Sequence, residues 1–134
     1  MNTFVLHLQS ATQYERLEAV LSFAGRDASG AFGVLAGHER MMTLLTFGLA
    51  HFRLADGSSS YLAIPGALLY FADNQLYLNT RRYLRGSDYE EVRSSLEKRF
   101  IAEEHELQNL RRSVRHLEEE MFRRLIEMNR DRLI

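Results

Sequence analysis

Apolar and polar residues alternate along the first 86 residues of the chain. In the residues after them, apolar positions recur with the spacing of a helix. Alternation places one face of a strand toward the core and the other toward solvent. Clear runs lie at residues 4–9, 17–23, 50–54 and 75–79. Their apolar phases include Phe4, Leu6, Leu8, Leu17, Ala19, Leu21, Phe23, Ala50, Phe52, Leu54, Leu76 and Leu78. Such regularly spaced runs predict an antiparallel all-β domain over residues 1–86, either a sandwich or a barrel.

Turn-forming residues separate these alternating runs. Glycine, aspartate and asparagine cluster at residues 25–27, 55–58 and 72–74. Asp56-Gly57 is a strong hairpin signal, because both residue types tolerate a positive φ. We therefore expect tight turns at these three places.

Residues 87–134 have a different pattern, which predicts a helical arm. The segment contains neither glycine nor proline, so it carries none of the residues that usually end a helix. Ser87 or Asp88 can cap its N-terminus, and Glu90 suits the positive end of the helix dipole. The abrupt change of spacing divides the chain into a β domain, residues 1–86, and this arm.

A narrow apolar stripe continues along the arm at the three-to-four spacing of a coiled coil. Its members are Leu107, Leu110, Val114, Leu117, Met121, Leu125 and Met128. The polar residues 102–106 weaken the stripe, so a bend there and a helical hairpin are open alternatives to one long helix. The lack of turn residues favours the long helix. A stripe of this kind needs a partner, and in the isolated protein a second copy of the arm can supply one.

The second half of the arm is rich in arginine, whereas its first half is acidic. Five of its seven arginines are the candidates for partner contact: Arg111, Arg112, Arg115, Arg123 and Arg124. Two of them follow a glutamate at a distance of four residues, a spacing that stabilises a helix by about 0.3 kcal/mol per pair. The arginines form either a solvated helix face or a surface for an acidic partner.

Composition excludes several classes of function. Of the 134 residues, 46% are hydrophobic and 26% are charged, and the net charge of −1 provides no field that attracts nucleic acid. Without cysteine, the chain can form neither disulfides nor thiolate metal sites. No apolar run approaches the roughly 18 residues of a membrane span, and the first residues lack the pattern of a signal peptide. These features predict a cytoplasmic protein.

The sequence contains no motif for catalysis or for binding a metal or cofactor. His7 and His51 fall on the polar phase of their strands, which predicts exposure to solvent. Gly30, Gly33 and Gly37 resemble a phosphate-binding loop only in composition, since no helix N-terminus follows them. We therefore expect no catalytic residue, no metal and no cofactor.

One series of motifs points to a known family. It comprises Gly30-Ala31-Phe32-Gly33-Val34-Leu35-Ala36-Gly37-His38, Met41-Met42-Thr43, Gly66-Ala67-Leu68-Leu69 and Arg85-Gly86-Ser87-Asp88. In this order the motifs resemble the epsilon subunit of rotary F-type ATP synthases, which is called delta in mitochondria. The resemblance implies a β-sandwich of about ten strands, followed by a C-terminal helical domain.

The resemblance also implies partners. In this family the sandwich binds the gamma subunit and rests on the membrane c-ring. The helical domain of many members moves along gamma and blocks ATP hydrolysis, with basic residues against the catalytic alpha and beta subunits. Carried over to this chain, the rotor contact comprises Ser29, Gly30, Ala31, Phe32, Gly33, Gly37, His38, Met41 and Met42. The protein is then expected to be peripheral, at the cytoplasmic face of the inner or plasma membrane.

Several positions depart from the family pattern. Ala36 stands where a proline usually precedes Gly-His. In the ATP-sensing motif, Glu90 replaces aspartate and Ser94 replaces alanine, while Arg93 is kept, so the altered motif argues against ATP binding. Beyond residue 100 the resemblance fades, because the turn of the usual helical hairpin is missing. The divergence resembles the alternate F-type ATPases that are thought to pump sodium, and the motifs do not distinguish sodium from proton transport.

Two functions fit these observations. The first is a non-catalytic central-stalk subunit that links gamma to the c-ring and inhibits ATP hydrolysis through its arm. The second is an unrelated β-sandwich interaction module that oligomerises through a coiled-coil arm. The Gly37-His38 block and the junction at residues 85–88 favour the first.

Overall fold

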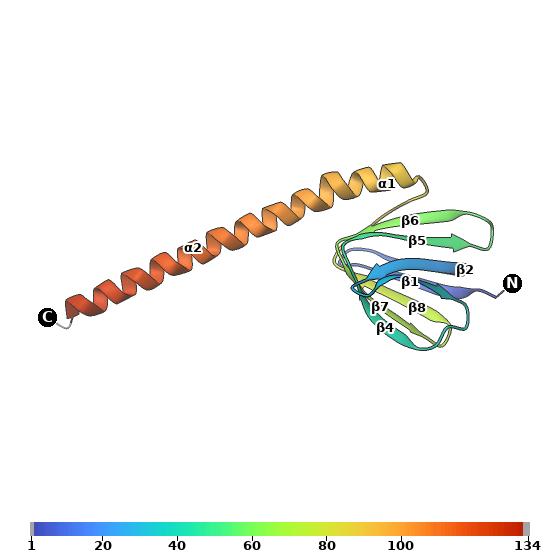
Figure 1. Cartoon of the computed structure of the whole chain (residues 1–134), viewed down its shortest axis with the longest axis horizontal. Helices are drawn as coiled ribbons and strands as arrows, with labels where there is room; N and C mark the ends of the chain where they lie inside the picture. Colours follow the sequence, from blue (N-terminus) through green and yellow to red (C-terminus); the bar gives the residue numbers. More distant parts are fainter. Residues whose placement is uncertain (1, 133–134) are drawn as a thin grey trace. The chain divides into compact units, whose positions relative to one another are not determined.

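The computed structural model describes residues 2–132. Residues 1, 133 and 134, at the ends of the predicted segments 1–86 and 87–134, lie outside the described residues. Within the described part, nine strands precede the helical residues (Figure 1). The strands are β1 (Phe4–Gln9), β2 (Tyr14–Asp27), β3 (Gly30–Leu35), β4 (Met41–Leu45), β5 (Gly48–Leu54), β6 (Ser59–Ile64), β7 (Ala67–Ala72), β8 (Gln75–Thr80) and β9 (Leu84–Gly86).

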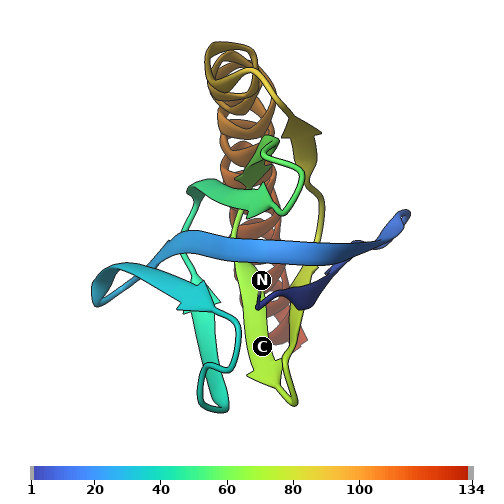
Figure 2. The ribbon, with the colours of Figure 1, turned by 90° about the vertical axis from the view of Figure 1, so that its right-hand side faces the viewer.

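The long strand β2 connects the two layers of a sandwich. Residues 14–20 of β2 pair with β1, and its later residues pair with β3 and β5 (Figures 1 and 2). The strand order is β1-β8-β7-β4-β2-β5-β6-β9, with β3 beside β2. Among the described pairings, only that of β1 with β8 is parallel. The predicted antiparallel β-sandwich is therefore confirmed.

The hydrophobic core lies between the two layers. Phe4, Phe23, Phe52 and Phe71 come from four different strands and are almost completely buried. Phe4 and Phe71 pack edge to face, with ring centroids 5.8 Å apart. The apolar phases predicted for β1, β5 and β8 point into this core, as alternation requires.

A β-bulge at Ala19 changes the alternation within β2. Ala19 has a φ of 58°, and the register with β1 shifts between Leu17 and Val20, whereas the register with β5 shifts between Val20 and Ser22. A bulge adds one residue to a strand, so the side chains after it point to the opposite face from the one that simple alternation predicts. Val20 is consequently buried, whereas Ala19, which the sequence pattern placed in the apolar phase, is exposed.

Two of the three predicted turns are confirmed. Residues 55–58 join β5 to β6, and Asp73 and Asn74, with φ of 52° and 59°, join β7 to β8. The prediction of a turn at residues 25–27 was wrong, because these residues belong to β2. The chain reverses directly after Asp27, which pairs with Gly30 across the hairpin.

The helical residues run without a break from Tyr89 to Arg132. They form α1 (Tyr89–Ser95), a π-helical segment η1 (Leu96–Phe100) and α2 (Ile101–Arg132). Asp88 is the N-cap, and its carboxylate accepts a hydrogen bond from the Glu90 amide at 3.0 Å. The long helix is therefore confirmed, and the hairpin alternative is excluded. The irregular turn lies at residues 96–100 rather than in the polar stretch 102–106.

The π-helical segment has a packing reason. Val92, Leu96 and Phe100 are buried in a second hydrophobic cluster with Ala63 of β6. In an α-helix, a spacing of four residues turns each successive side chain about 40° further around the axis. The wider π turn corrects this drift. Phe100 is thereby kept on the side of the helix that faces the sheet.

The chain forms two compact units, which meet between Phe100 and Ile101. α1 and η1 therefore belong with the sandwich, where they contact β6 and α1 also contacts β9. Gly86 permits this packing, because a Cβ atom there would lie 2.8 Å from the Val92 Cγ2 atom. The second unit is α2. Independent folding of residues 1–86 stays a prediction.

Candidate functional site

The residues proposed for rotor contact lie in two places. Ser29 and Gly30 are at the β2–β3 hairpin, whereas Gly37 and His38 follow the other end of β3. Six residues of extended strand separate the two groups, which corresponds to roughly 20 Å. Ala31 and Gly33 are exposed along β3, while Phe32 packs partly into the core. The residues predicted for rotor contact therefore fall into two groups at opposite ends of β3, and their contact with a rotor stays a prediction.

Asp27 holds the β2–β3 hairpin in shape. Its carboxylate accepts hydrogen bonds from the amide and hydroxyl of Ser29 and from the hydroxyl of Thr43, at 2.8 Å in the last case. These hydrogen bonds, the Ser29 hydroxyl first, lower the pKa of Asp27 below its usual value. The hairpin therefore presents an ionised carboxylate beside Gly30 at neutral pH.

The Gly37-His38 end is fixed through Asn74. Gly37 has a φ of 77°, and its amide donates to the Asn74 side-chain oxygen at 2.9 Å. Asn74 in turn donates to the Thr3 carbonyl at 2.7 Å. His38 is exposed, and its ring meets the edge of Phe71 with centroids 5.8 Å apart. These links, with a hydrogen bond between the His38 Nδ1 atom and the Glu39 carbonyl at 2.7 Å, order the surface loop.

Next to His38, an apolar patch covers the outer face of β4, β7 and β8. Met42 and Leu44 are 65% and 69% exposed, while the neighbouring Met41 points inward and packs partly against the core. Across the sheet, Met42 pairs with Tyr70 and Leu44 with Leu68. We call this set the outer patch, and its members are the exposed residues Met42, Leu44, Leu68 and Tyr77 together with the half-buried Tyr70.

Sequence reasoning found Met42 but missed the rest of the outer patch. The available signal was an apolar residue on the polar phase of a strand, as at Leu44 and Leu68. Isolated exposed apolar residues are common on soluble proteins. A patch becomes recognisable only when strand pairing places them side by side.

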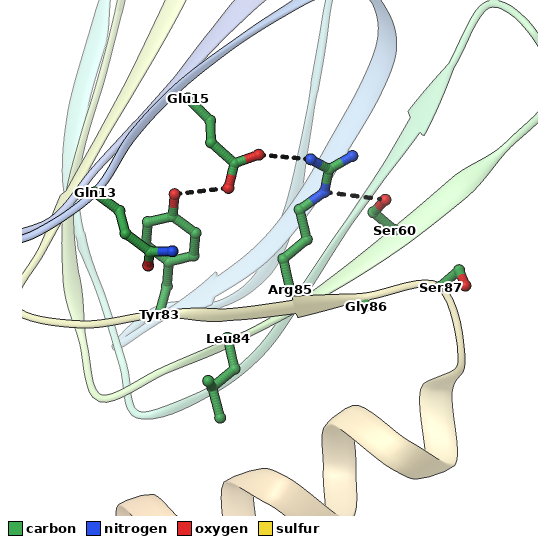
Figure 3. Close-up of a pocket in the computed structure, with 8 residues that line it drawn as sticks. All are labelled: Gln13, Glu15, Ser60, Tyr83, Leu84, Arg85, Gly86 and Ser87. Carbon is green, nitrogen blue, oxygen red and sulfur yellow. Dashed lines mark hydrogen bonds and ion pairs between the residues drawn. The ribbon is translucent and has the colours of Figure 1, made fainter.

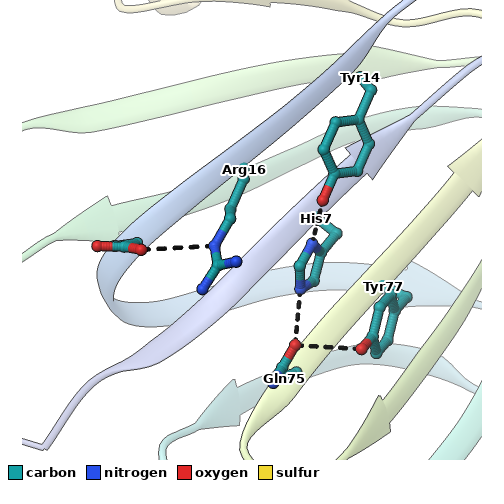
Figure 4. A network of polar contacts seen from close by, with 6 residues as sticks. His7, Tyr14, Arg16, Gln75 and Tyr77 are labelled. Carbon is teal, nitrogen blue, oxygen red and sulfur yellow. Dashed lines mark hydrogen bonds and ion pairs between the residues drawn. The ribbon is translucent and has the colours of Figure 1, made fainter.

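A polar network extends the outer patch over β1 and β2 (Figure 4). His7 is only 8% exposed, so the prediction that it faces solvent was wrong. Its Nδ1 atom accepts from the Tyr14 hydroxyl at 2.6 Å, and its Nε2 atom donates to the Gln75 side-chain oxygen at 2.8 Å. Tyr77 stacks on the imidazole at 4.5 Å and donates to the same oxygen of Gln75. The network holds Tyr14 and Tyr77 in fixed positions on the surface.

The arm presents its apolar stripe and its arginines to solvent. Leu110, Leu117 and Met121 are each at least 60% exposed. At 100° per residue, Arg111 and Arg124 flank opposite sides of the stripe. The remaining arginines lie further round, with Arg112 and Arg123 opposite the stripe. The five arginines therefore do not form one face. A partner that contacts the stripe meets two of them directly.

The residues of the altered ATP-sensing motif are paired with each other. Arg93 lies 3.5 Å from the carboxylate of Glu90 and 3.5 Å from that of Glu97, all on exposed side chains. An arginine already held by two carboxylates presents less positive charge to a nucleotide.

We expect the isolated protein to bind ATP with no better than millimolar affinity. Glu90 and Glu97 compete with phosphate for Arg93, and Ser94 replaces the small apolar residue of the usual motif. Isothermal titration calorimetry of the full chain with ATP measures this. Micromolar binding that Arg93→Ala abolishes would contradict the prediction.

The described residues hold neither a candidate metal site nor a candidate membrane span. Residues 2–132 contain no group of three histidine, aspartate or glutamate side chains able to hold a metal ion. Of the helices in the described part, none combines the length and apolarity that crossing a membrane requires.

The β domain is similar in sequence to known proteins. Residues 6–86 match the model of the family described as ATP synthase, Delta/Epsilon chain, beta-sandwich domain. ATP synthase epsilon chain 2 of Cereibacter sphaeroides is 30% identical over 86 residues, which are 63% of this chain and 59% of the relative. The ATP synthase epsilon chain of Streptomyces coelicolor is 39% identical over 61 residues, covering 46% and 48%. The chain thus spans about half to three fifths of the length of these curated relatives.

Two solved structures have the same fold. A chain in the Euglena gracilis mitochondrial ATP synthase, from a structure of OSCP, F1 and the c-ring, aligns with a TM-score of 0.60 and 23% identity. That alignment covers 73% of this chain and 64% of the other. A chain from the central stalk and c-ring of the Tetrahymena thermophila enzyme aligns with a TM-score of 0.54 and 11% identity, covering 63% and 69%. At these identities the likeness concerns the fold alone.

Proposed function

Because residues 6–86 match its β-sandwich domain, the chain belongs to the ATP synthase delta/epsilon chain family, and on this basis we propose that it is the epsilon-type subunit in the central stalk of a rotary F-type ATP synthase. An epsilon chain is a non-catalytic subunit, as the sequence predicted. The observation that carries the proposal is the outer patch beside the Gly37-His38 loop, an apolar surface on the family's own domain.

The two ends of β3 suit two rotor partners. The gamma subunit binds the outer patch and the adjacent loop of Gly37 and His38, where apolar side chains are exposed together. The c-ring contacts the β2–β3 hairpin at Ser29 and Gly30. Binding of one partner at each place makes the sandwich a link between gamma and the ring. The protein is then held at the cytoplasmic face of the membrane by the complex.

The arm contacts gamma through its apolar stripe and the catalytic alpha and beta subunits through its arginines. Coiled-coil packing buries a stripe of this spacing against another helix. The arginines on either side of the stripe, Arg111 and Arg124, then face acidic segments of the catalytic subunits. This arrangement lowers ATP hydrolysis. In the isolated protein the same stripe pairs with a second copy.

Aspartate at positions 42 and 44 is expected to prevent binding of the cognate gamma subunit. The double variant Met42→Asp with Leu44→Asp puts two charges into an interface that is otherwise apolar, and it should weaken the complex at least about a hundredfold. Both side chains point to solvent in the free protein, so the fold should persist. Calorimetry with purified gamma, together with circular dichroism, measures both effects.

Tyr89→Asp is the matched control. Tyr89 is 46% exposed but belongs to α1, outside the outer patch and the Gly37-His38 loop. It should leave gamma binding within about twofold, since no partner is proposed for this position. Undiminished binding by the double variant would overturn the proposed docking surface.

A further inference from the structure

The apolar stripe of α2 is symmetric about the point midway between residues 115 and 116. Leu110 and Met121 lie equally far from this midpoint, and so do Val114 and Leu117. All four side chains are exposed on one uninterrupted helix (Figure 1). In a pair of identical helices that run in opposite directions, residues equally far from the centre come level with each other. Leu110 then packs against Met121 of the second copy, and Val114 packs against Leu117.

Charged residues are arranged in the opposite sense about the same midpoint. Three arginines precede it and three glutamates follow it, namely Arg111, Arg112, Arg115, Glu118, Glu119 and Glu120. An antiparallel pair places the arginines of each copy beside the glutamates of the other. A parallel pair places arginines beside arginines and glutamates beside glutamates, which is unfavourable. The order of the charges therefore selects the antiparallel direction.

The closest charge contact between two such copies joins Arg111 to Glu118. The two residues are seven positions apart, so at 100° per residue they lie on the same side of the stripe. An antiparallel pair brings Arg111 beside Glu118 of the second copy, and the twofold symmetry repeats the contact. Among the described residues, neither side chain has an ion pair within its own chain. Both are therefore available to a second copy.

The same charges fix the register of the two helices. If the second copy moved by one heptad, Glu118 would lie beside Glu118 or Arg111 would lie beside Arg111, depending on the direction of the shift. On the other side of the stripe, Glu106 comes level with a point between Arg124 and Glu127 of the second copy, so attraction and repulsion offset each other there. The register centred on residues 115 and 116 is thus the most favourable one.

We propose that two copies of the chain pair through α2 as an antiparallel coiled coil centred between residues 115 and 116. This inference deepens the self-association that is part of the proposed function, and it specifies the direction and the register. The pair buries the stripe that packs against gamma in the proposed function. A subunit must therefore leave the pair before its arm can bind in the assembled enzyme. Pairing itself needs no other subunit.

Distances between spin labels on the full chain test the direction of pairing. The chain has no cysteine, so one introduced cysteine carries one label per copy. Labels on Asn129→Cys should lie about 40 Å apart, because residue 129 is far from the midpoint and a helix rises about 1.5 Å per residue. A parallel pair would hold these labels within about 25 Å of each other. Double electron–electron resonance measures the distance.

His116→Cys is the matched control, because residue 116 lies at the midpoint and its labels stay within about 25 Å in either direction. Both labelled positions are exposed on α2. Short distances at both positions would show a parallel pair, and a long distance at residue 116 would place the contact elsewhere. Either result would overturn the inference. Monomeric protein in sedimentation analysis would overturn it together with self-association, while the central-stalk role is tested separately by binding to gamma.

Exchange of the two contacting charges supplies a second test, read out by sedimentation equilibrium. Arg111→Glu and Glu118→Arg each place like charges together at both contacts and should each weaken the pair about tenfold. The variant with both changes should recover to within about threefold of the unchanged chain. Arg112→Glu is the control, because residue 112 lies on the side of the helix away from the stripe, and it should weaken the pair less than about threefold. Absence of recovery in the double variant would overturn the proposed register.

Discussion

Replacing Phe100 with alanine is expected to release α1 and η1 from the sheet while the sandwich stays folded. Phe100 is 2% exposed and contacts the Phe47 ring with centroids 6.4 Å apart. The guanidinium of Arg82 lies 5.6 Å from the Phe100 ring centre. Few other residues anchor this helical segment, because Val92 and Leu96 are its remaining buried residues.

The expected loss is about 3 kcal/mol, the lower end for truncating a buried phenylalanine. The main core does not include Phe100, so the loss should appear as local opening and not as unfolding of the whole domain. Hydrogen exchange in residues 92–100 should accelerate roughly a hundredfold, while amides around Phe23 keep their protection.

Ile101→Ala is the matched control, because Ile101 is the next residue and is 40% exposed. It should change exchange in residues 92–100 less than about threefold. If Phe100→Ala instead accelerated exchange at Phe23 and Val92 equally, the helical segment and the sandwich would unfold as one unit. The prediction that the helical segment can detach while the sandwich stays folded would then be wrong.

Features of the fold that depend on residues close together in sequence could be predicted, and features that depend on distant residues could not. Alternation in β1 and β5 and the Asp56-Gly57 turn depend on neighbouring residues, and both were predicted. The bulge at Ala19 was not, because its register is decided by pairing with β1 and β5 together. The π turn at residues 96–100 likewise depends on packing against β6. Helix propensity carries no information about that packing, so the sequence did not predict the turn.

The candidate surfaces divide in the same way. The motif that contains Gly37 and His38 predicted one of the candidate surfaces, because a family resemblance can be recognised from consecutive residues. The burial of His7 depends on Gln75, which is 68 residues away in sequence, and on Tyr77. The ion pair of Glu15 with Arg85 likewise joins residues that are 70 positions apart in sequence (Figure 3). Contacts between residues so far apart in sequence produce no periodic pattern that a single sequence could reveal.

Removing residues 107–134 is expected to raise ATP hydrolysis by the assembled enzyme several-fold. The stripe residues Leu110, Leu117 and Met121 are exposed in α2, so an assembled enzyme gains from burying them. In the proposed arrangement, the arm held against gamma resists rotation in the direction of hydrolysis, so its removal should take that resistance away. ATP synthesis should change less. Steady-state hydrolysis by the reconstituted complex, with assembly checked by gel filtration, measures the effect.

Two full-length variants separate the stripe from the charges. Leu117→Asp with Met121→Asp should activate hydrolysis as the deletion does, because a charged stripe cannot pack against a helix. Arg111→Glu with Arg124→Glu should also activate, since these two arginines flank the stripe. Arg112→Glu with Arg123→Glu is the control, because both lie on the opposite side of the helix. Activation by the stripe variant alone would make the arm a packing clamp without a charge contact. Unchanged hydrolysis after the deletion, in a fully assembled enzyme, would exclude an inhibitory arm altogether.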